Sequence, residues 1–309
     1  MNRPNDGIFR QFRGELRENE PLAGHTSLRV GGPADWLALP ADRDDLLGLL
    51  AVLESKRLPW LVIGGGYNLL VRDGGFRGVV ISLERLAAVE RLPGDRIRAE
   101  AGATNQQLAR FCRDEWLTGL EFLAMIPGTV GGALAVNAGA YGAAVMERVV
   151  RLVTRTGGSL REWGATERTF GYRRHVMAPG EVILAAEFQL SPGDADTIDT
   201  LLADYRAHRQ ESQRISLPNA GSFFKNPLGE QAWRLIDRAG LRGCQVGGAQ
   251  VAEAHANFLV NAGGATARDF LELAALVKER VRSTSGVELE EEVRIVGEDG
   301  GSGLGTGDW

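Results

Sequence analysis

The sequence predicts a mixed α+β fold with more than one domain. The chain has 309 residues, which is longer than one average domain. Its residues are 44% apolar, enough for a buried core, so most of the chain should be globular. Segments with helical and strand periodicity follow one another without an internal repeat.

Helices and strands are both expected within the first 212 residues. Residues 42–58 and 104–116 have apolar residues at helical spacing, and Thr104 is a suitable N-cap. Pro93-Gly94-Asp95 and Gly157-Gly158 are turn sequences between strand-like runs, so each predicts a hairpin. The expected strands and hairpins lie in residues 59–63, 78–83, 89–102, 149–163 and 181–190, and a further helix covers 196–212.

The last third of the chain begins near residue 213, where a looser segment suggests a domain boundary. Helices are expected over 229–240, ending at Gly240, and over 266–283, where Thr266 and Asp269 form a capping box. Strands are expected over 256–261 and over the alternating segment 286–297. Residues 1–20 are expected to be a flexible surface segment, and residues 298–309 a disordered tail.

Charge and composition argue against several classes of protein. The net charge is −5 without a basic block, so a nucleic-acid partner is not expected. No apolar run is long enough for a membrane span or signal peptide, which predicts a cytoplasmic protein without membrane contact. Cys112 and Cys244 lack metal-binding spacing, so neither a metal site nor a disulfide is expected.

Two glycine-rich segments are candidates for binding an anion such as a diphosphate. They are Gly64-Gly65-Gly66 and the region from Gly128 to Gly142. Glycine lets the backbone approach a phosphate closely and adopt positive φ. The dinucleotide motif GxGxxG is not met, because Leu69 stands where its last glycine belongs, so a Rossmann fold is disfavoured. Purely structural glycines remain an equal alternative on the residues alone.

Six short motifs then identify a family resemblance. IGGGYNLL, IPGTVGGA, NAGAYG, FGYRRHV, AGSFFKNP and LEEEVRIVG follow one another in this order. Together they resemble the UDP-N-acetylenolpyruvoylglucosamine reductase family, from about His25 to Gly297. The resemblance implies a vanillyl-alcohol-oxidase-type (PCMH-type) FAD-binding domain over 21–212, made of two α+β subdomains at about 21–84 and 85–212. A smaller α/β substrate-binding domain over 213–297 would follow.

The resemblance also implies the cofactors and the substrate. FAD would be tightly bound, NADPH would donate the hydride, and the substrate would be UDP-N-acetylglucosamine enolpyruvate. The protein would be a monomer or weak dimer. The residues assigned to FAD by this resemblance are Gly64, Gly65, Gly66, Tyr67, Asn68, Leu69, Pro127, Gly128, Thr129, Gly131, Gly132, Asn137, Gly139 and Gly142.

The chain departs from the family pattern at two places. Tyr67 replaces the usual serine of the first loop, and Arg174-His175 replace the usual Asp-Ser after Arg173. With the first change, the side-chain hydroxyl contact to the pyrophosphate would be either lost or re-made, while the backbone donors can remain. The second change leaves open what orients Arg173. Only 48 residues separate Arg173 from Ser222, which suggests the shorter type II form of the family.

Three residues are expected to be catalytic by the same resemblance: Arg173, Ser222 and Glu292. Arg173 would stabilise the enolate formed when a hydride reaches the substrate, and Ser222 would protonate its carbon. Glu292 would share in proton handling if burial raises its pKa. On the residues alone, a structural cap or turn is the commoner role for a serine such as Ser222, and Glu292 could simply be a solvated residue. Tyr172, Arg173, Lys225, Asn226 and His255 are the expected substrate-binding residues.

Two other functions remain open from the sequence. A flavin-dependent oxidase could use the same FAD scaffold, and a non-catalytic protein could bind UDP-sugars. A hydrolase is disfavoured because no pattern ties His208 or His255 to Ser222 as a base. The reductase explains the motifs of the last third of the chain, which the other two functions leave without a role.

Overall fold

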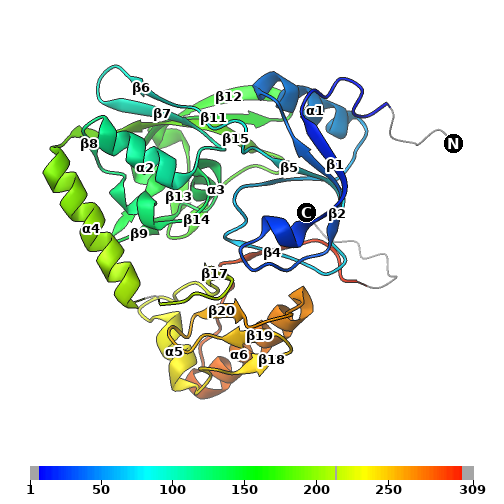
Figure 1. The fold of residues 1–309 in the computed structure, drawn as a ribbon, viewed down its shortest axis with the longest axis vertical. Coiled ribbons are helices and arrows are strands. Elements are labelled where there is room, and N and C mark those ends of the chain that lie inside the picture. Colours follow the sequence, from blue (N-terminus) through cyan, green and yellow to red (C-terminus); the bar gives the residue numbers. More distant parts are fainter. Residues whose placement is uncertain (1–6, 213, 301–309) are drawn as a thin grey trace.

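The computed structural model describes residues 7–212 and 214–300. Within them, a four-stranded and a five-stranded sheet with their helices form most of the upper part of the molecule in Figure 1, and another four-stranded sheet with two helices forms the lower part. The long helix α4 (Ala195–Ser212) runs down one side from the upper part toward the lower one. Helices and strands are mixed throughout, so the expected α+β fold is confirmed.

The first sheet has the strand order β1-β2-β5-β3. Strands β2 (Pro33–Leu39), β5 (Phe76–Ser82) and β3 (Trp60–Ile63) are parallel, and β1 (Glu15–Pro21) lies antiparallel to β2. Helix α1 (Arg43–Ser55) connects β2 to β3, and Asp42 caps it by accepting a hydrogen bond from the Asp45 backbone N–H. Strand β3 ends one residue before Gly64, which places the first glycine loop at the end of this sheet.

The second sheet is antiparallel, in the order β12-β11-β15-β7-β6. Its two expected hairpins are present: β6 (Val89–Leu92) with β7 (Arg96–Glu100), and β11 (Val149–Thr156) with β12 (Ser159–Gly164). Strand β15 (Val182–Gln189) lies between β11 and β7. Helices α2 (Asn105–Asp114) and α3 (Val130–Ala135), capped by Thr104 and Thr129, pack with α1 in the same hydrophobic core.

The lower part contains the sheet β17-β20-β19-β18, which is antiparallel. Its strands are β17 (Asn219–Ser222), β18 (Gln245–Val246), β19 (Ala249–Val251) and β20 (Phe258–Asn261). Helix α6 (Ala267–Ser285) has the expected capping box of Thr266 and Asp269. Its stripe Phe270, Ala274, Val277 and Val281 is buried. Helix α5 (Ala232–Arg238) begins at Ala232, later than residue 229, because Asn226 Oδ1 accepts the Ala232 N–H.

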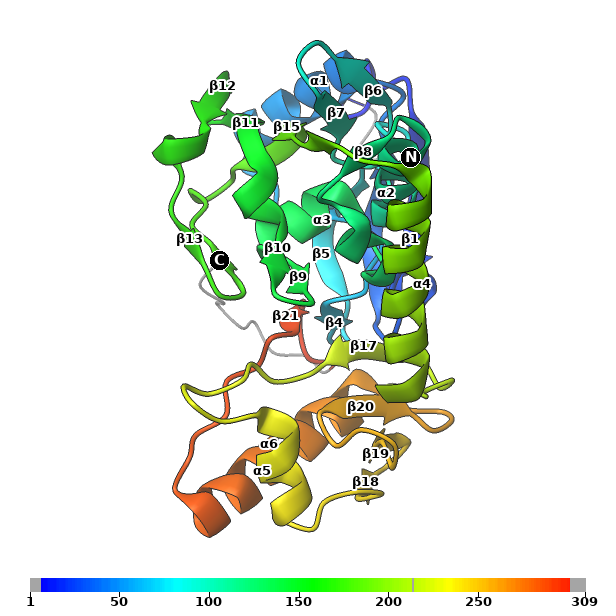
Figure 2. The ribbon, with the colours of Figure 1, turned by 90° about the vertical axis from the view of Figure 1, so that its left-hand side faces the viewer.

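The end of the chain returns to the upper part. Strand β21 (Arg294–Val296) pairs in parallel with β4 (Leu69–Val71), directly after the first glycine loop, and Figure 2 shows this pair where the two parts meet. Leu28, Val30 and Leu70 of the upper part belong to the same core as Phe270 of α6 and Leu235 of α5. The two parts therefore share a hydrophobic interface beside the first glycine loop.

Three expectations about the ends of the chain need correction. Residues 15–20 are not flexible, because they form most of β1 in the first sheet, and Phe9 packs against Trp36. The segment 286–297 is a strand only at β21; its earlier residues follow an irregular path with one bridge between Phe224 and Glu291. Glu298 pairs with Gly75, so the tail is ordered there. Residues 1–6 and 301–309 lie outside the described residues.

Candidate active site

The two glycine loops contact each other through their glycines. A Cβ atom added at Gly64 would lie 2.5 Å from Thr129 Oγ1, and one added at Gly65 would lie 3.2 Å from Gly128 Cα. These distances are shorter than normal van der Waals contacts, so larger residues would push the loops apart. Residues 64–68 and 127–132 therefore form one cradle, as expected for a shared ligand.

The cradle has backbone donors available for an anion. Within the described residues, the N–H groups of Gly65, Gly66 and Tyr67 donate no hydrogen bond to the protein. Gly66 has φ +67°, and a Cβ there would lie 2.0 Å from the carbonyl oxygen of His25, so only glycine fits. Consecutive N–H groups without protein partners suit a diphosphate. The residues present thus fit a dinucleotide cofactor such as FAD.

Tyr67 lies at the mouth of this cradle. Its side chain is half exposed, and its ring lies beside the two loops: Cδ2 would be 3.0 Å from a Cβ at Gly65 and 3.7 Å from one at Gly128. The tyrosine that replaces the usual serine therefore faces both loops. Its backbone N–H stays available, so the substitution preserves the donors of the cradle.

Several other residues expected to contact FAD have structural tasks. Asn137 is buried; its Nδ2 donates to the Gly171 carbonyl at 2.8 Å, and its Oδ1 accepts the Met146 N–H at 3.1 Å. Gly139 and Gly142 belong to the short hairpin of β9 (Gly139–Ala140) and β10 (Ala143–Ala144), where Gly142 has φ +81°. These contacts give the three residues a structural role, and their contact with FAD stays a prediction. Leu69 is a buried residue of β4.

Arg173 lies in the turn of a short hairpin that comes from the upper part. The strands are β13 (Phe170–Gly171) and β14 (Arg174–His175), and Arg173 has the left-handed φ of +50°. Its Nε lies 2.9 Å from Glu292 Oε1, although the N–H does not point along that line and makes no hydrogen bond among the described residues. The hairpin thus brings a guanidinium group to the strand region that carries Glu292.

Glu292 is held against the first glycine loop. Asn68 Nδ2 donates to the Glu292 carbonyl at 3.0 Å, and the Arg294 N–H donates to the Asn68 carbonyl at 3.1 Å. The Glu292 side chain is only 17% exposed. Burial raises its pKa above the ordinary value, and the nearby charges of Arg173 and Lys225 oppose this only in part. It is therefore not the solvated residue that the alternating pattern alone would suggest.

Ser222 is the last residue of β17 and follows a bulge. The register of β17 against β20 shifts between Asn219 and Ser222, and Gly221 between them has φ +74°. Such a bulge re-aims the following side chain. The Ser222 hydroxyl makes no hydrogen bond to any described residue, so it does not cap a turn.

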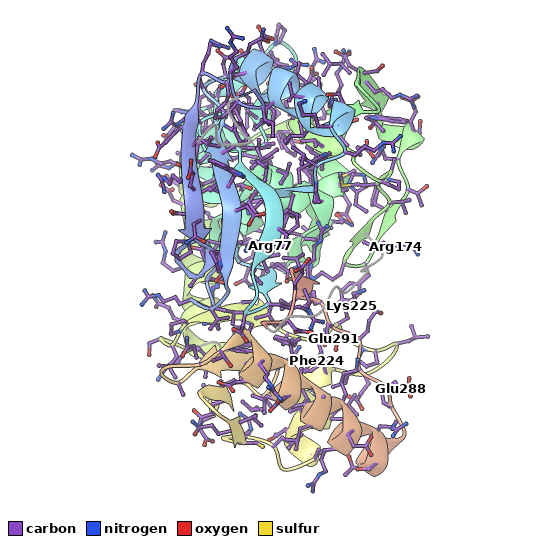
Figure 3. All side chains as sticks on the ribbon, turned by 90° about the vertical axis from the view of Figure 1, so that its right-hand side faces the viewer. Arg77, Arg174, Phe224, Lys225, Glu288 and Glu291 are labelled. Atoms are coloured by element: carbon purple, nitrogen blue, oxygen red, sulfur yellow. The ribbon has the colours of Figure 1, made fainter. Side chains whose placement is uncertain are left out.

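The backbone next to Ser222 is joined to Glu292. The Glu292 N–H donates to the Phe223 carbonyl at 2.8 Å, and the Lys225 N–H donates to the Glu290 carbonyl at 2.8 Å. Figure 3 labels Phe224, Lys225 and Glu291 where the two parts of the molecule meet, with Arg174 of the hairpin above them. Residues 222–225 and 290–292 therefore run side by side, and Arg173 reaches the same place from the upper part.

The remaining expected substrate-binding residues differ in their surroundings. Lys225 Nζ pairs with Glu290, and Tyr172 is 60% exposed with the Arg173 Cζ 5.4 Å from its ring centroid. Asn226 Oδ1 accepts the N–H of Ala232, the first residue of α5, at 3.0 Å. His255 packs between Trp233 and Phe258, and its Nδ1 accepts the Asn257 N–H at 3.3 Å. The contacts of His255 are thus local to the lower part.

Two buried polar residues near the site, Asn257 and His175, were not among the expected site residues. Asn257 is buried; its Oδ1 accepts the Phe224 N–H at 3.0 Å, and its Nδ2 donates to the Phe224 carbonyl at 2.8 Å. It therefore fixes the segment that carries Ser222. His175 is the buried residue of β14 in the hairpin that carries Arg173. The available signal for Asn257 was an amide directly before the apolar run FLV, where a buried polar residue needs a partner.

Comparisons with known proteins agree with this arrangement. The FAD binding domain family model matches residues 34–162, and the model of the UDP-N-acetylenolpyruvoylglucosamine reductase C-terminal domain matches 212–296. The fold and the glycine cradle thus define an FAD-dependent oxidoreductase with a PCMH-type FAD-binding domain. No described helix has the length and apolar content needed to span a membrane, and no described cluster of side chains could hold a metal ion.

Relatives over nearly the whole chain identify the family. A UDP-N-acetylenolpyruvoylglucosamine reductase of Geotalea uraniireducens is 61% identical, covering 93% of this chain and 96% of the relative. One of Geobacter metallireducens is 58% identical, covering 96% and 100%. The crystal structure of the reductase from Thermus caldophilus matches with a TM-score of 0.78 at 32% identity, covering 92% and 98%. The chain belongs to the UDP-N-acetylenolpyruvoylglucosamine reductase family, as the six motifs had indicated.

Proposed function

We propose that this protein reduces the enolpyruvyl ether of UDP-N-acetylglucosamine to UDP-N-acetylmuramate, with NADPH as the hydride donor, in peptidoglycan precursor synthesis. The observation that carries the proposal is the approach of Arg173 to Glu292 at 2.9 Å, beside Asn68 of the glycine cradle. Residues 21–212 would bind FAD and residues 213–297 the substrate. A nucleotide sugar and a reduced nicotinamide are cytoplasmic metabolites, so the reaction belongs in the cytoplasm.

The cofactor site would be the cradle of residues 64–68 and 127–132. Its N–H groups at Gly65, Gly66 and Tyr67 would bind the diphosphate of FAD. FAD, when bound, supplies the hydride that is added to the substrate double bond. Because Asn68 of the cradle donates a hydrogen bond to the Glu292 carbonyl, the bound FAD and Glu292 would be held at a fixed position relative to each other.

Arg173 would bind the substrate carboxylate. Hydride addition to the outer vinyl carbon leaves negative charge on the carbon beside the carboxylate, and this charge spreads into an enolate. A guanidinium group offers a permanent charge and a fork of donors, which suits such a dianion. The poor hydrogen-bond direction between Arg173 and Glu292 supports this role, because the Nε N–H of Arg173 has no partner among the described residues and can donate to a carboxylate.

Ser222 would protonate the enolate carbon. Its hydroxyl makes no hydrogen bond to any described residue, and the bulge at Gly221 directs it away from the regular strand pairing. A serine hydroxyl becomes a credible acid when it is held in line with a strongly basic carbon. Burial raises the pKa of Glu292, which favours its protonated form. Glu292 would hydrogen-bond the substrate carboxyl group and share in the proton transfer. Lys225 would approach the substrate diphosphate.

An anaerobic titration tests the proposal. Purified protein loaded with FAD is mixed with NADPH and then with the enolpyruvyl sugar nucleotide. We expect bleaching of the flavin by NADPH and its recovery on addition of the substrate, with UDP-N-acetylmuramate as product. Recovery only after oxygen is admitted would indicate an oxidase instead, and binding of the nucleotide without product would indicate a non-catalytic binder.

A further inference from the structure

A buried polar network lies beneath the hairpin that carries Arg173. His175 Nε2 accepts a hydrogen bond from Arg168 Nε at 3.0 Å, and His175 Nδ1 lies 2.9 Å from the Leu134 carbonyl oxygen of α3. Arg168 in turn donates to both carboxylate oxygens of Glu181, at 2.9 and 3.1 Å. The side chains of Arg168 and Glu181 are only 7% and 1% exposed. The network thus joins the hairpin to α3 and to Glu181, which directly precedes β15.

These contacts determine the protonation state of His175. The Arg168 guanidinium is always protonated and can only donate, so His175 Nε2 must be the unprotonated acceptor. The proton is then on Nδ1, where it is donated to the Leu134 carbonyl. Arg168 and Glu181 are the charged groups that face His175, and α3 (Val130–Ala135) has no charged side chain. Burial, assisted by the Arg168 charge, lowers the pKa of His175, so the neutral ring is favoured.

The other strand of this hairpin, β13, is also attached to the rest of the protein by hydrogen bonds. The Gly171 carbonyl accepts from Asn137 Nδ2 at 2.8 Å, and Phe170 pairs with His175 across the hairpin. Only the turn residues Tyr172 and Arg173 project beyond these attachments. Arg173 has a left-handed φ of +50°, a conformation that a non-glycine residue keeps only when its surroundings enforce it. The two attachments beside the turn can enforce it.

We propose that His175 is a positioning residue for Arg173: locked as the neutral Nδ1–H tautomer between Arg168 and the Leu134 carbonyl, it sets the place of the guanidinium opposite Glu292. The inference rests on the proposed function for its kinetic consequence. It also answers, for this chain, what orients Arg173 where Arg174-His175 replace the usual Asp-Ser. Protonation of His175 would place a second N–H against Arg168 Nε and break the network.

The tautomer can be measured without cofactor or substrate. The chain has four histidines, so ¹H–¹⁵N correlation spectra of ¹⁵N-histidine-labelled protein can be assigned by substitution. At neutral pH we expect the His175 ring to be neutral with its proton on Nδ1. A ring protonated on Nε2, or on both nitrogens, would overturn the inference. This measurement stands whether or not the proposed reaction is correct.

A double-mutant cycle tests the link to Arg173. His175→Leu should slow the oxidation of reduced flavin by substrate by about 10-fold or more, because a small displacement of a binding group is costly to catalysis. Flavin reduction by NADPH should stay unchanged. In an Arg173→Ala background the same substitution should cause no further loss, whereas a full additional loss would show that His175 acts independently of Arg173 and would overturn the inference.

Arginine substitutions provide a matched control. The guanidinium groups of Arg168 and Arg161 both lie over the Trp163 ring, at 4.7 and 5.6 Å from its centroid, but only Arg168 contacts His175 and Glu181. Arg168→Lys should reproduce the effect of His175→Leu, and Arg161→Lys should not. Equal effects of the two would contradict the inference. Wild-type protein that forms no product would refute the proposed function instead, and the tautomer spectrum would still decide the inference.

Discussion

Arg173 Nε and Glu292 Oε1 lie 2.9 Å apart, yet the Arg173 N–H points elsewhere. The charges attract each other at this distance, but no directed hydrogen bond fixes them. The guanidinium comes from a hairpin of the upper part, and the carboxyl group comes from the segment that returns to the first glycine loop. A substrate carboxylate could therefore bind Arg173 without first breaking a directed hydrogen bond between Arg173 and Glu292.

The raised pKa of Glu292 gives a pH prediction with a definite sign. A folded-state pKa above the ordinary value of 4.5 means that the folded protein binds the proton more tightly than the unfolded chain. The contribution of Glu292 to the free energy of unfolding is therefore fully present below pH 4.5 and is lost as the pH rises through the folded-state pKa. Urea denaturation of the cofactor-free protein should show this loss in the wild type and not in Glu292→Gln.

Glu290→Gln is the control for this experiment, since Glu290 is an exposed carboxylate of the same segment. It should keep the wild-type pH dependence. A Glu292→Gln variant whose stability changes with pH just as the wild type does would show that Glu292 titrates normally.

Replacing Arg173 by lysine should weaken catalysis strongly. Lysine keeps the positive charge but loses the fork of donors that an enolate dianion needs. We expect the rate of flavin reoxidation by substrate to fall by about 10²-fold, as for the loss of one preorganised donor. The exposed neighbour Arg174 provides the control, and Arg174→Lys should react at the wild-type rate in the same stopped-flow measurement. Equal rates for both variants would exclude the carboxylate role of Arg173.

The contact between the glycine loops predicts a cofactor-binding defect. A Cβ at Gly65 would lie 3.0 Å from the Tyr67 ring and 3.2 Å from Gly128 Cα, so Gly65→Ala should spread the cradle and lower the FAD content. At Gly48 in α1, a Cβ would meet nothing within 4 Å, and Gly48→Ala should stabilise the helix by up to about 1 kcal/mol. Flavin absorbance per protein after purification should separate the two. Full FAD content in Gly65→Ala would refute the cradle.

Replacing Asn257 should lower the free energy of unfolding. Asn257→Ala removes two side-chain hydrogen bonds and leaves the Phe224 N–H and carbonyl without partners in a buried place. An unsatisfied buried group costs about 1–3 kcal/mol, so we expect a loss of about 2–4 kcal/mol in the free energy of unfolding. Urea denaturation measures it. Asn226→Ala, which removes one part-buried hydrogen bond to the first N–H of α5, should lose only about 1 kcal/mol.

Much of the local structure could be predicted from the sequence. Helix periodicity and caps identified α1, α2 and α6, and turn residues identified the hairpins at Pro93-Gly94 and Gly157-Gly158. These features depend on neighbouring residues only. Alternation over 286–297 was misleading, because this segment forms its hydrogen bonds with Phe223, Lys225 and Asn68 rather than with one continuous strand partner.

The site could be predicted in part. The motifs selected Arg173, Ser222 and Glu292, and Arg173 and Glu292 do lie together. The burial of Glu292 could not be read from its polar surroundings in the sequence, because it results from distant segments that pack around it. His175 and Asn257 were missed for the same reason: each is defined by backbone partners far away along the chain, Leu134 and Phe224.

The role of Ser222 is the central claim, and separate rates for the two half-reactions test it most directly. Rapid mixing of Ser222→Ala with NADPH, and then of the reduced protein with the enolpyruvyl sugar nucleotide, gives both rates. We predict unchanged flavin reduction and a second step slowed by about 10²-fold or more, as for a lost proton donor. A second step at the wild-type rate, or equal slowing of both steps, would contradict the account.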